Sequence, residues 1–135
     1  MAGTHGPTSS VLRLRAEPSA VRRARDFVQD KCAAITESAR DAVVLMVSEL
    51  VTNAVRHGSP PIAVMVHGAR WGVQVSVVDD HPDRPVIRPH SLDVTGGRGM
   101  QVIDALATAW GVRLRPIGKA VWFILLDDQR APAVI

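Results

Sequence analysis

A carboxylate and a carboxamide lie four residues apart inside the longest apolar-periodic run of the sequence. Glu49 and Asn53 are separated by a largely aliphatic tripeptide, and His57 follows four residues later. Residues at this spacing share one face of a helix. Polar groups embedded in an apolar helix need partners, because each unsatisfied group costs ~1–3 kcal/mol. Another helix of the protein can supply those partners, and so can a bound ligand.

Two further clusters lie at the ends of other predicted elements. Asp79 ends an apolar strand, and Gly97-Arg98-Gly99 leads into a helix that begins at Met100. A buried carboxylate, an amide that can hold a hydrated cation, and free N–H groups at a helix start together suit a purine nucleotide with magnesium. Each cluster alone also fits a structural explanation, such as a satisfied polar pair, a strand-ending turn or a turn that needs glycine.

Several common site motifs are missing from the sequence. Gly118-Lys119 is followed by Ala120 and lacks the upstream glycine of a P-loop, and Gly97-x-Gly99 lacks the third glycine of a dinucleotide fingerprint. The five histidines show no zinc spacing. The single cysteine, Cys32, cannot form an internal disulfide and is predicted to lie in the core.

Hydrophobic periodicity predicts the elements that position these clusters. The core stripe of the longest helix is predicted to contain Val43, Met46, Val47, Leu50 and Ala54. A long aperiodic loop is predicted at 80–97, and Gly111 is predicted to end the third helix. Three helices and five strands favour an α+β fold, with a mixed, mostly antiparallel sheet covered on one face by helices. Strands are predicted at 11–15, 62–67, 73–78, 112–115 and 120–126, and helices at 19–32, 36–56 and 100–110.

Composition fits one folded domain. The 135 residues are 47% hydrophobic and 21% charged, with a net charge of +3. This mild positive charge permits an acidic partner but does not demand nucleic acid. The first helix carries a basic face (Arg22, Arg23, Arg25, Lys31), which suits solvation, an acidic partner protein or, less well, nucleic acid. Neither a secretory leader nor a membrane span is visible, so we expect a soluble cytoplasmic protein.

Five stretches carry a resemblance to a known family. Residues 49–58 (ELVTNAVRHG) resemble the N box of the gyrase/chaperone/histidine-kinase/MutL ATPase superfamily. Asp79-x-x-Pro82-x-x-Pro85 is similar to its first glycine box and Gly97-Arg98-Gly99-Met100 to its second. Trp110-Gly111 and residues 118–123 resemble the close of its small bacterial branch, which includes the anti-sigma-factor serine kinases. The similarity covers residues 10–127, between a leader (1–9) predicted to be disordered and a tail (128–135).

The resemblance implies a two-layer α/β sandwich of the Bergerat type that binds ATP and Mg²⁺. It implies that Asn53 ligates magnesium, that Glu49 is the general base, and that Asp79 accepts a hydrogen bond from the adenine amino group. Residues 80–97 would form the ATP lid. The other residues that the resemblance assigns to ATP binding are His57, Gly97, Arg98, Gly99, Met100 and Ala120.

Two departures from the family pattern concern the adenine end of this site. His81 replaces a glycine or small residue, and Ala120 stands where the pattern has a threonine. One lost hydrogen bond costs ~0.5–1.5 kcal/mol. We therefore expect the affinity for ATP to be lowered, and we expect the roles of Glu49 and Asn53 to be unaffected.

The function that this resemblance implies is a serine/threonine protein kinase acting as an anti-sigma factor. It would phosphorylate an antagonist protein and bind either that antagonist or a sigma factor, and the resemblance also suggests a homodimer. The alternative is a nucleotide-gated binding module that sequesters a partner without turnover.

Overall fold

The computed structural model describes residues 8–81 and 98–128 of the chain. Most of the predicted leader, tail and 80–97 loop therefore falls outside the described residues. Thr8 and Ser9 were expected in the leader but belong to the first strand. The elements follow one another as β1 (Thr8–Leu14), α1 (Ser19–Lys31), α2 (Glu37–His57), β2 (Ile62–Ala69), β3 (Gly72–Asp79), α3 (Arg98–Leu106), β4 (Ala109–Leu114) and β5 (Lys119–Leu126).

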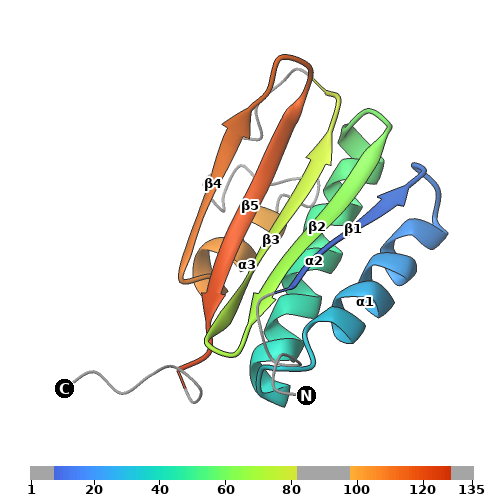
Figure 1. Ribbon diagram of the computed structural model, residues 1–135. Helices are drawn as coiled ribbons and strands as arrows, with labels where there is room; N and C mark the ends of the chain where they lie inside the picture. Colours follow the sequence, from blue (N-terminus) through green and yellow to red (C-terminus); the bar gives the residue numbers. More distant parts are fainter. Residues whose placement is uncertain (1–7, 82–97, 129–135) are drawn as a thin grey trace.

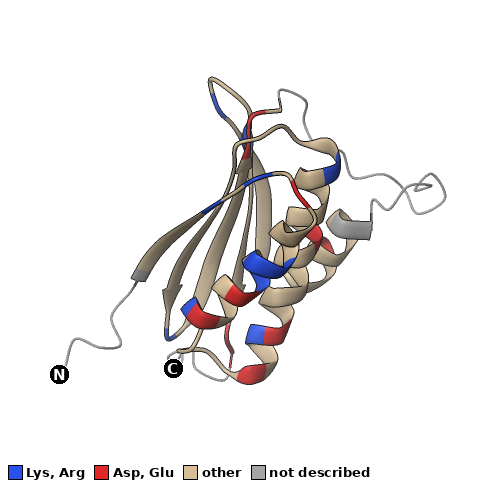
Figure 2. Cartoon of the chain, turned by 90° about the vertical axis from the view of Figure 1, so that its right-hand side faces the viewer, with Lys and Arg blue, Asp and Glu red and all other residues tan. Residues whose placement is uncertain are grey.

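The strands form one sheet in the order β1-β2-β3-β5-β4, and every neighbouring pair is antiparallel. The helices all lie against the same face of this sheet, and the other face carries no helix of the described chain (Figure 1). Seen from the side, sheet and helices form two layers (Figure 2). The predicted α+β sandwich is confirmed, with a sheet that is antiparallel throughout rather than mixed.

Helix α2 is the central helix, because it packs against both α1 and α3 as well as against the sheet. It begins where predicted: Thr36 is the N-cap, and its hydroxyl accepts a hydrogen bond from the Ala39 N–H at 3.4 Å. Its predicted core stripe is confirmed, with Val51 as an additional member. This helix carries both Glu49 and Asn53.

Strand alternation builds the rest of the core. Val73, Val75 and Val77 of β3 point towards the helices, as do Val121 and Phe123 of β5. Residues between them point to the opposite face, because successive side chains of a strand alternate. The parity of a residue in β3 or β5 therefore decides whether it can reach α2.

The third helix ends earlier in the structure than the sequence predicted. We expected it to continue to Trp110, whereas α3 spans Arg98–Leu106 and Trp110 lies in β4, where it pairs with Phe123. Gly111 lies in the same strand opposite Trp122 and does not end a helix. Sheet pairing, which sequence periodicity does not reveal, determines this boundary.

None of the helices in the described segments is long and apolar enough to cross a membrane. The outer surfaces of the helices mix basic and acidic side chains (Figure 2). Cys32, as expected, is buried at the end of α1.

Candidate functional site

Glu49 and Asn53 lie half-buried on α2, and within the described residues neither makes a hydrogen bond or ion pair. Their polar neighbours behave differently. The Ser48 hydroxyl donates to the Val44 carbonyl at 2.8 Å, and the Thr52 hydroxyl donates to the Ser48 carbonyl at 2.6 Å. Ser48 and Thr52 are thus satisfied within the helix, whereas the carboxylate and the carboxamide remain available to a ligand.

The end of α2 is joined to the end of β3. The Asp80 N–H donates to the Ser59 carbonyl at 2.9 Å. Gly58, the C-cap of α2, packs directly against Asp79: a Cβ at position 58 would lie 3.0 Å from both Cγ and Oδ2 of that carboxylate. The end of α2 and the predicted adenine-binding aspartate therefore lie side by side.

The Asp79 carboxylate is almost fully buried, with the residue 4% exposed. Its Oδ1 accepts a hydrogen bond from the backbone N–H of His81 at 2.7 Å. The same oxygen accepts a charged hydrogen bond from Lys119 Nζ at 3.1 Å. Since His81 uses its backbone N–H here, its departure from the family pattern leaves this bond intact.

Lys119 reaches Asp79 because of the β3–β5 register. The two residues are directly opposite in the antiparallel pair, and Lys119 has the same parity as the core residues Val121 and Phe123. Gly118 makes the approach of the two strands possible. It adopts φ +79°, and a Cβ there would lie 2.0 Å from the Asp79 carbonyl oxygen.

Ala120 does not lie with the other candidate residues. It pairs with Val78 in the β3–β5 register, and both side chains line a hollow of about 540 Å³ on the sheet face opposite Asp79. This placement contradicts the prediction that Ala120 belongs to the nucleotide site. The physical reason is strand alternation, which points residue 119 towards α2 and residue 120 away from it. The lost hydrogen bond expected at Ala120 therefore does not apply.

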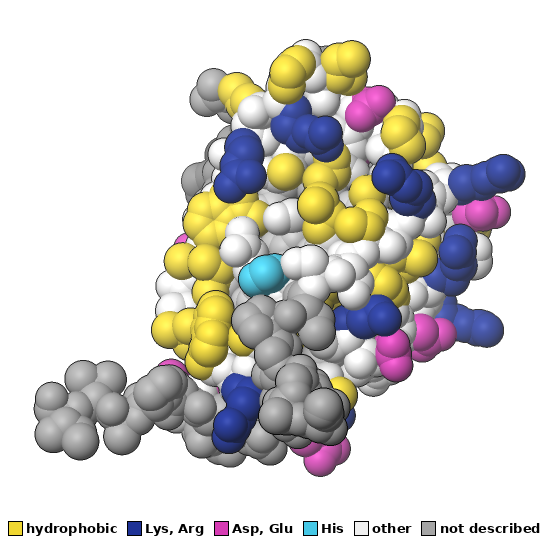
Figure 3. Space-filling view, in the orientation of Figure 1, with side chains coloured by type: hydrophobic (Ala, Val, Ile, Leu, Met, Phe, Trp, Pro, Cys, Tyr) yellow, Lys and Arg dark blue, Asp and Glu magenta, His cyan; other side chains and the backbone are white. Residues whose placement is uncertain are grey.

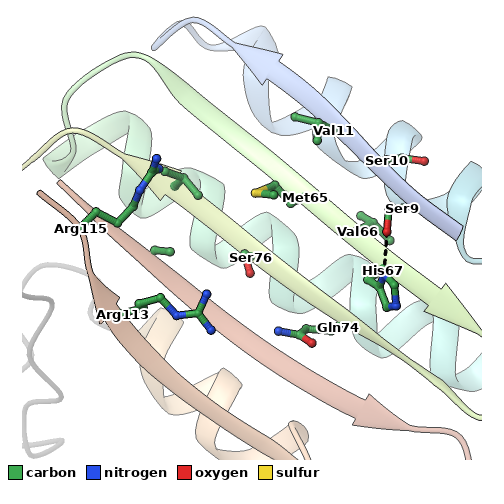
Figure 4. A pocket seen from close by; sticks show the side chains of 12 residues that line it. Ser9, Ser10, Val11, Met65, Val66, His67, Gln74, Ser76, Arg113 and Arg115 are labelled. Atoms are coloured by element: carbon green, nitrogen blue, oxygen red, sulfur yellow. Dashed lines mark hydrogen bonds between the residues drawn. The ribbon is translucent and has the colours of Figure 1, made fainter. Parts of the chain in front are cut away.

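The hollow on this face is a separate feature of the molecule. Figure 4 shows Arg113 and Arg115 on one side of it, and Ser9 and His67 on the other. The Ser9 hydroxyl and His67 Nδ1 are joined by a 2.6 Å hydrogen bond. Figure 3, which looks onto this face, shows apolar and basic side chains interspersed across it.

The third predicted cluster lies at the start of α3. This helix begins at Arg98 and packs against α2. The Met100 side chain is buried in the core, so only its backbone N–H can serve a ligand. Gly97 and the side chains of Arg98 and Gly99 lie outside the described residues. The first N–H groups of a helix have no partner within that helix, which makes this terminus suitable for phosphate.

The candidate residues of α2 follow one another along the helix axis. His57 is exposed at the last position of α2 and precedes Gly58, the residue that packs against Asp79. Counting from Gly58, Asn53 lies about 7.5 Å and Glu49 about 13.5 Å back along the helix at 1.5 Å per residue. This order places the buried Asp79 carboxylate at one end, the Asn53 carboxamide in the middle, and the Glu49 carboxylate at the far end.

These residues fit a nucleotide-bound magnesium ion better than a metal cage made by protein alone. Within the described segments, no group of three His, Cys, Asp or Glu side chains is arranged to hold a metal. Magnesium normally takes only one or two protein oxygens and completes its shell with water and substrate phosphates. The unpaired amide of Asn53 offers one such oxygen.

Sequence reasoning did not single out Lys119, because it placed this residue in the connection between the strands predicted at 112–115 and 120–126. One sequence signal could have found it. Counting back in steps of two from Phe123 through Val121 places residue 119 on the core face of its strand. A lysine on a core face needs a counter-charge, since buried charges are paired. What the sequence could not supply was the register that puts Asp79 opposite it.

Comparison with known families identifies the class of protein. Residues 14–125 match the model of the histidine kinase-like ATPase domain. This match covers most of the chain, and the protein belongs to that family. A comparison with curated protein sequences gives no match.

Two solved structures illustrate the shared fold. One contains the RsbU and RsbW domains of Rv1364c from Mycobacterium tuberculosis; its TM-score is 0.66 at 23% identity, over 88% of this chain and 32% of that one. The other is the histidine kinase domain of the blue-light-activated histidine kinase EL346 from Erythrobacter litoralis, with TM-score 0.51 at 19% identity, over 83% of this chain and 61% of that one. The chain thus spans less than two thirds of either relative, and the likeness concerns the fold.

Proposed function

We propose that this protein binds ATP with Mg²⁺ and transfers the γ-phosphoryl group to a serine or threonine of an antagonist protein. In this proposal it acts as an anti-sigma factor in a partner-switching system. Family membership supports ATP binding. The structural likeness to a chain containing an RsbW domain supports the choice of the anti-sigma branch.

One observation carries the proposal. Two half-buried polar side chains, Glu49 and Asn53, are without partners in the described residues on the very helix whose end packs against the buried Asp79 carboxylate. In the described residues no buried side-chain polar atom lacks a partner, so the free polar atoms of Glu49 and Asn53 face solvent, where a ligand can reach them. A nucleotide extended along α2 would satisfy all three.

The proposed residue roles follow from their chemistry. Asp79 accepts a hydrogen bond from the base, Asn53 would hold magnesium, and the start of α3 offers its N–H groups to phosphate. Magnesium, when bound, neutralises phosphate charge. Glu49 takes the proton from the hydroxyl group of the acceptor serine or threonine. The hydroxyl oxygen then bonds to the γ-phosphorus of ATP, while the bond between this phosphorus and the oxygen of the leaving ADP breaks. Phosphoryl transfer needs mainly positioning and charge neutralisation, so this short set can suffice.

The partners and setting belong to the same proposal. The protein would bind either a sigma factor or the antagonist in the cytoplasm, where both encounter ATP. Residues 10–127 would form the ATPase domain. A homodimer is the proposed assembly, which analytical ultracentrifugation of the full chain tests directly.

Phosphoryl transfer is tested with labelled ATP, magnesium and candidate antagonist proteins. We expect Glu49→Gln to lower labelling by about 10²–10⁴-fold, because general bases contribute that much. ATP affinity should stay unchanged. The matched control is Glu37→Gln, which alters an exposed glutamate in the first turn of the same helix. Equal labelling by wild type and Glu49→Gln would refute the role given to Glu49.

A non-catalytic binding module is the second candidate. The observation that favours it is the sheet face without helices of the described chain, where Val11 and Met65 are 50% and 46% exposed beside the hollow. Such exposed apolar side chains are typical of partner-binding surfaces. Calorimetric binding of ATP without any labelling of partners, together with ATP-dependent capture of a partner protein, would favour this module over the kinase.

A further inference from the structure

We infer that Lys119 is a nucleobase-binding residue, which together with Asp79 presents a hydrogen-bond donor beside an acceptor to one edge of a purine. This inference rests on the proposed ATP binding and adds a residue that determines base specificity. The acceptor is Oδ2 of Asp79, and the donor is the ammonium group of Lys119.

The geometry of the pair leaves both groups available. Within the described residues, the hydrogen bonds to the Asp79 carboxylate all fall on Oδ1. Oδ2 lies beside Gly58, where an added Cβ would come within 3.0 Å of it, so the glycine keeps this side of the carboxylate free of a side chain. The Lys119 ammonium has three N–H donors, and Asp79 takes one of them at 3.1 Å.

The pair must persist when a base binds. The side chains of Lys119 and Asp79 are only 9% and 5% exposed. Separating a buried ion pair leaves two uncompensated charges, which costs more than a hydrogen bond to a neutral amino group returns. An exocyclic amino group carries no charge, so it cannot replace the ammonium. Lys119 therefore stays beside Asp79 and becomes part of the surface that the base meets.

A base that fits this surface needs an amino donor next to a ring acceptor. Adenine has this arrangement, with its 6-amino group beside N1. The amino group donates to Asp79 Oδ2, while Lys119 donates to N1. A hydrogen bond from a charged donor is worth more than a neutral one, so the N1 contact contributes measurably to affinity.

The inference is tested by calorimetry of the full chain with Mg²⁺ and either ATP or 1-deaza-ATP, in which a C–H group replaces N1. We expect the wild type to bind 1-deaza-ATP roughly tenfold or more weakly than ATP. Lys119→Met should bind the two nucleotides equally. Lys31→Met is the matched control, because it removes the only other lysine, on α1, and should discriminate as the wild type does.

The outcomes separate this inference from the proposed function. Equal affinities of the wild type for ATP and 1-deaza-ATP overturn the role of Lys119 but leave ATP binding in place. Persistent discrimination by Lys119→Met overturns it as well. No binding of ATP overturns both. If Lys119→Met fails to fold, the comparison of ATP with 1-deaza-ATP on the wild type decides the inference by itself.

Discussion

At the residue scale, Gly118 lies where β3 and β5 meet, and its backbone has a conformation that residues other than glycine rarely adopt. Its φ is +79°, and an added Cβ would lie 2.0 Å from the Asp79 backbone oxygen. We predict that Gly118→Ala lowers the free energy of unfolding by roughly 2 kcal/mol or more, through left-handed strain and displacement of β3. Chemical denaturation measures this loss.

Gly111→Ala is the control for this prediction. Its added Cβ would meet the indole ring of Trp122 at 2.8 Å, a side chain that can move, rather than backbone. We expect a smaller loss than for Gly118→Ala. A Gly118→Ala protein as stable as Gly111→Ala would show that the junction does not constrain residue 118.

Cys32 offers a prediction about reactivity. Burial raises the pKa of its thiol to about 11 from an ordinary 9.0, while Arg40 opposes the rise. Because the thiolate is the reactive form, the folded chain should resist alkylation at pH 8, and the urea-unfolded chain should react readily. The raised pKa also means that this thiol's contribution to stability is complete below about pH 9 and is lost as the pH rises towards 11. Equal alkylation rates in folded and unfolded chains would contradict the burial.

Residue type and spacing alone singled out Glu49, Asn53 and Asp79, and the structure joins the helix of the first two to the carboxylate of the third. Lys119 could not be assigned in this way. Its role depends on its pairing with Asp79, which lies forty residues earlier in the sequence. No local sequence pattern encodes such a pairing. Ala120 was chosen for its place in a motif, and one step of strand alternation moved it to the other face.

At the scale of elements, Asp127 ties the end of β5 to the start of α2. Its carboxylate accepts the Thr36 N–H at 2.7 Å and the Thr36 hydroxyl at 3.1 Å, and the residue is 3% exposed. We predict that Asp127→Ala destabilises the protein by ~1–3 kcal/mol, because the N-cap of the site helix loses a charged acceptor. Urea unfolding gives the difference.

Asp128→Ala is the matched control, since Asp128 is the exposed neighbour and has no such bonds in the described chain. Its stability should stay within about 0.5 kcal/mol of the wild type, as for most surface substitutions. If both variants are equally stable, the link between α2 and β5 contributes nothing.

The helices α1 and α2 and the β2–β3 hairpin were predictable because each has one dominant period. The boundary between α3 and β4 was not. Trp110 fits helical spacing after Ile103 and also alternates with Val112 in a strand. Both Trp110 and Val112 pack against the core in the structure. Trp110 belongs to a strand rather than to the helix because it pairs with Phe123 of β5.

At the scale of the whole molecule, one sheet face is covered by helices and holds the candidate site, while the other carries no helix of the described residues (Figure 1). In the proposed function the nucleotide lies against α2, and the opposite face presents apolar and basic side chains (Figure 3). Composition and element order predicted the layers. They could not predict which face each β5 residue serves, because that depends on pairing between distant strands.

The central claim is that ATP binds along α2 through Asn53. Isothermal titration of ATP with Mg²⁺ into the wild type, Asn53→Ala and Thr52→Ala tests it most directly. Thr52 is the matched control, because its hydroxyl is bonded to the Ser48 carbonyl at 2.6 Å within the helix. We predict one ATP per wild-type chain, binding at least roughly tenfold weaker in Asn53→Ala, and unchanged affinity in Thr52→Ala. Wild-type affinity in Asn53→Ala, or no binding by the wild type at millimolar ATP, would contradict it.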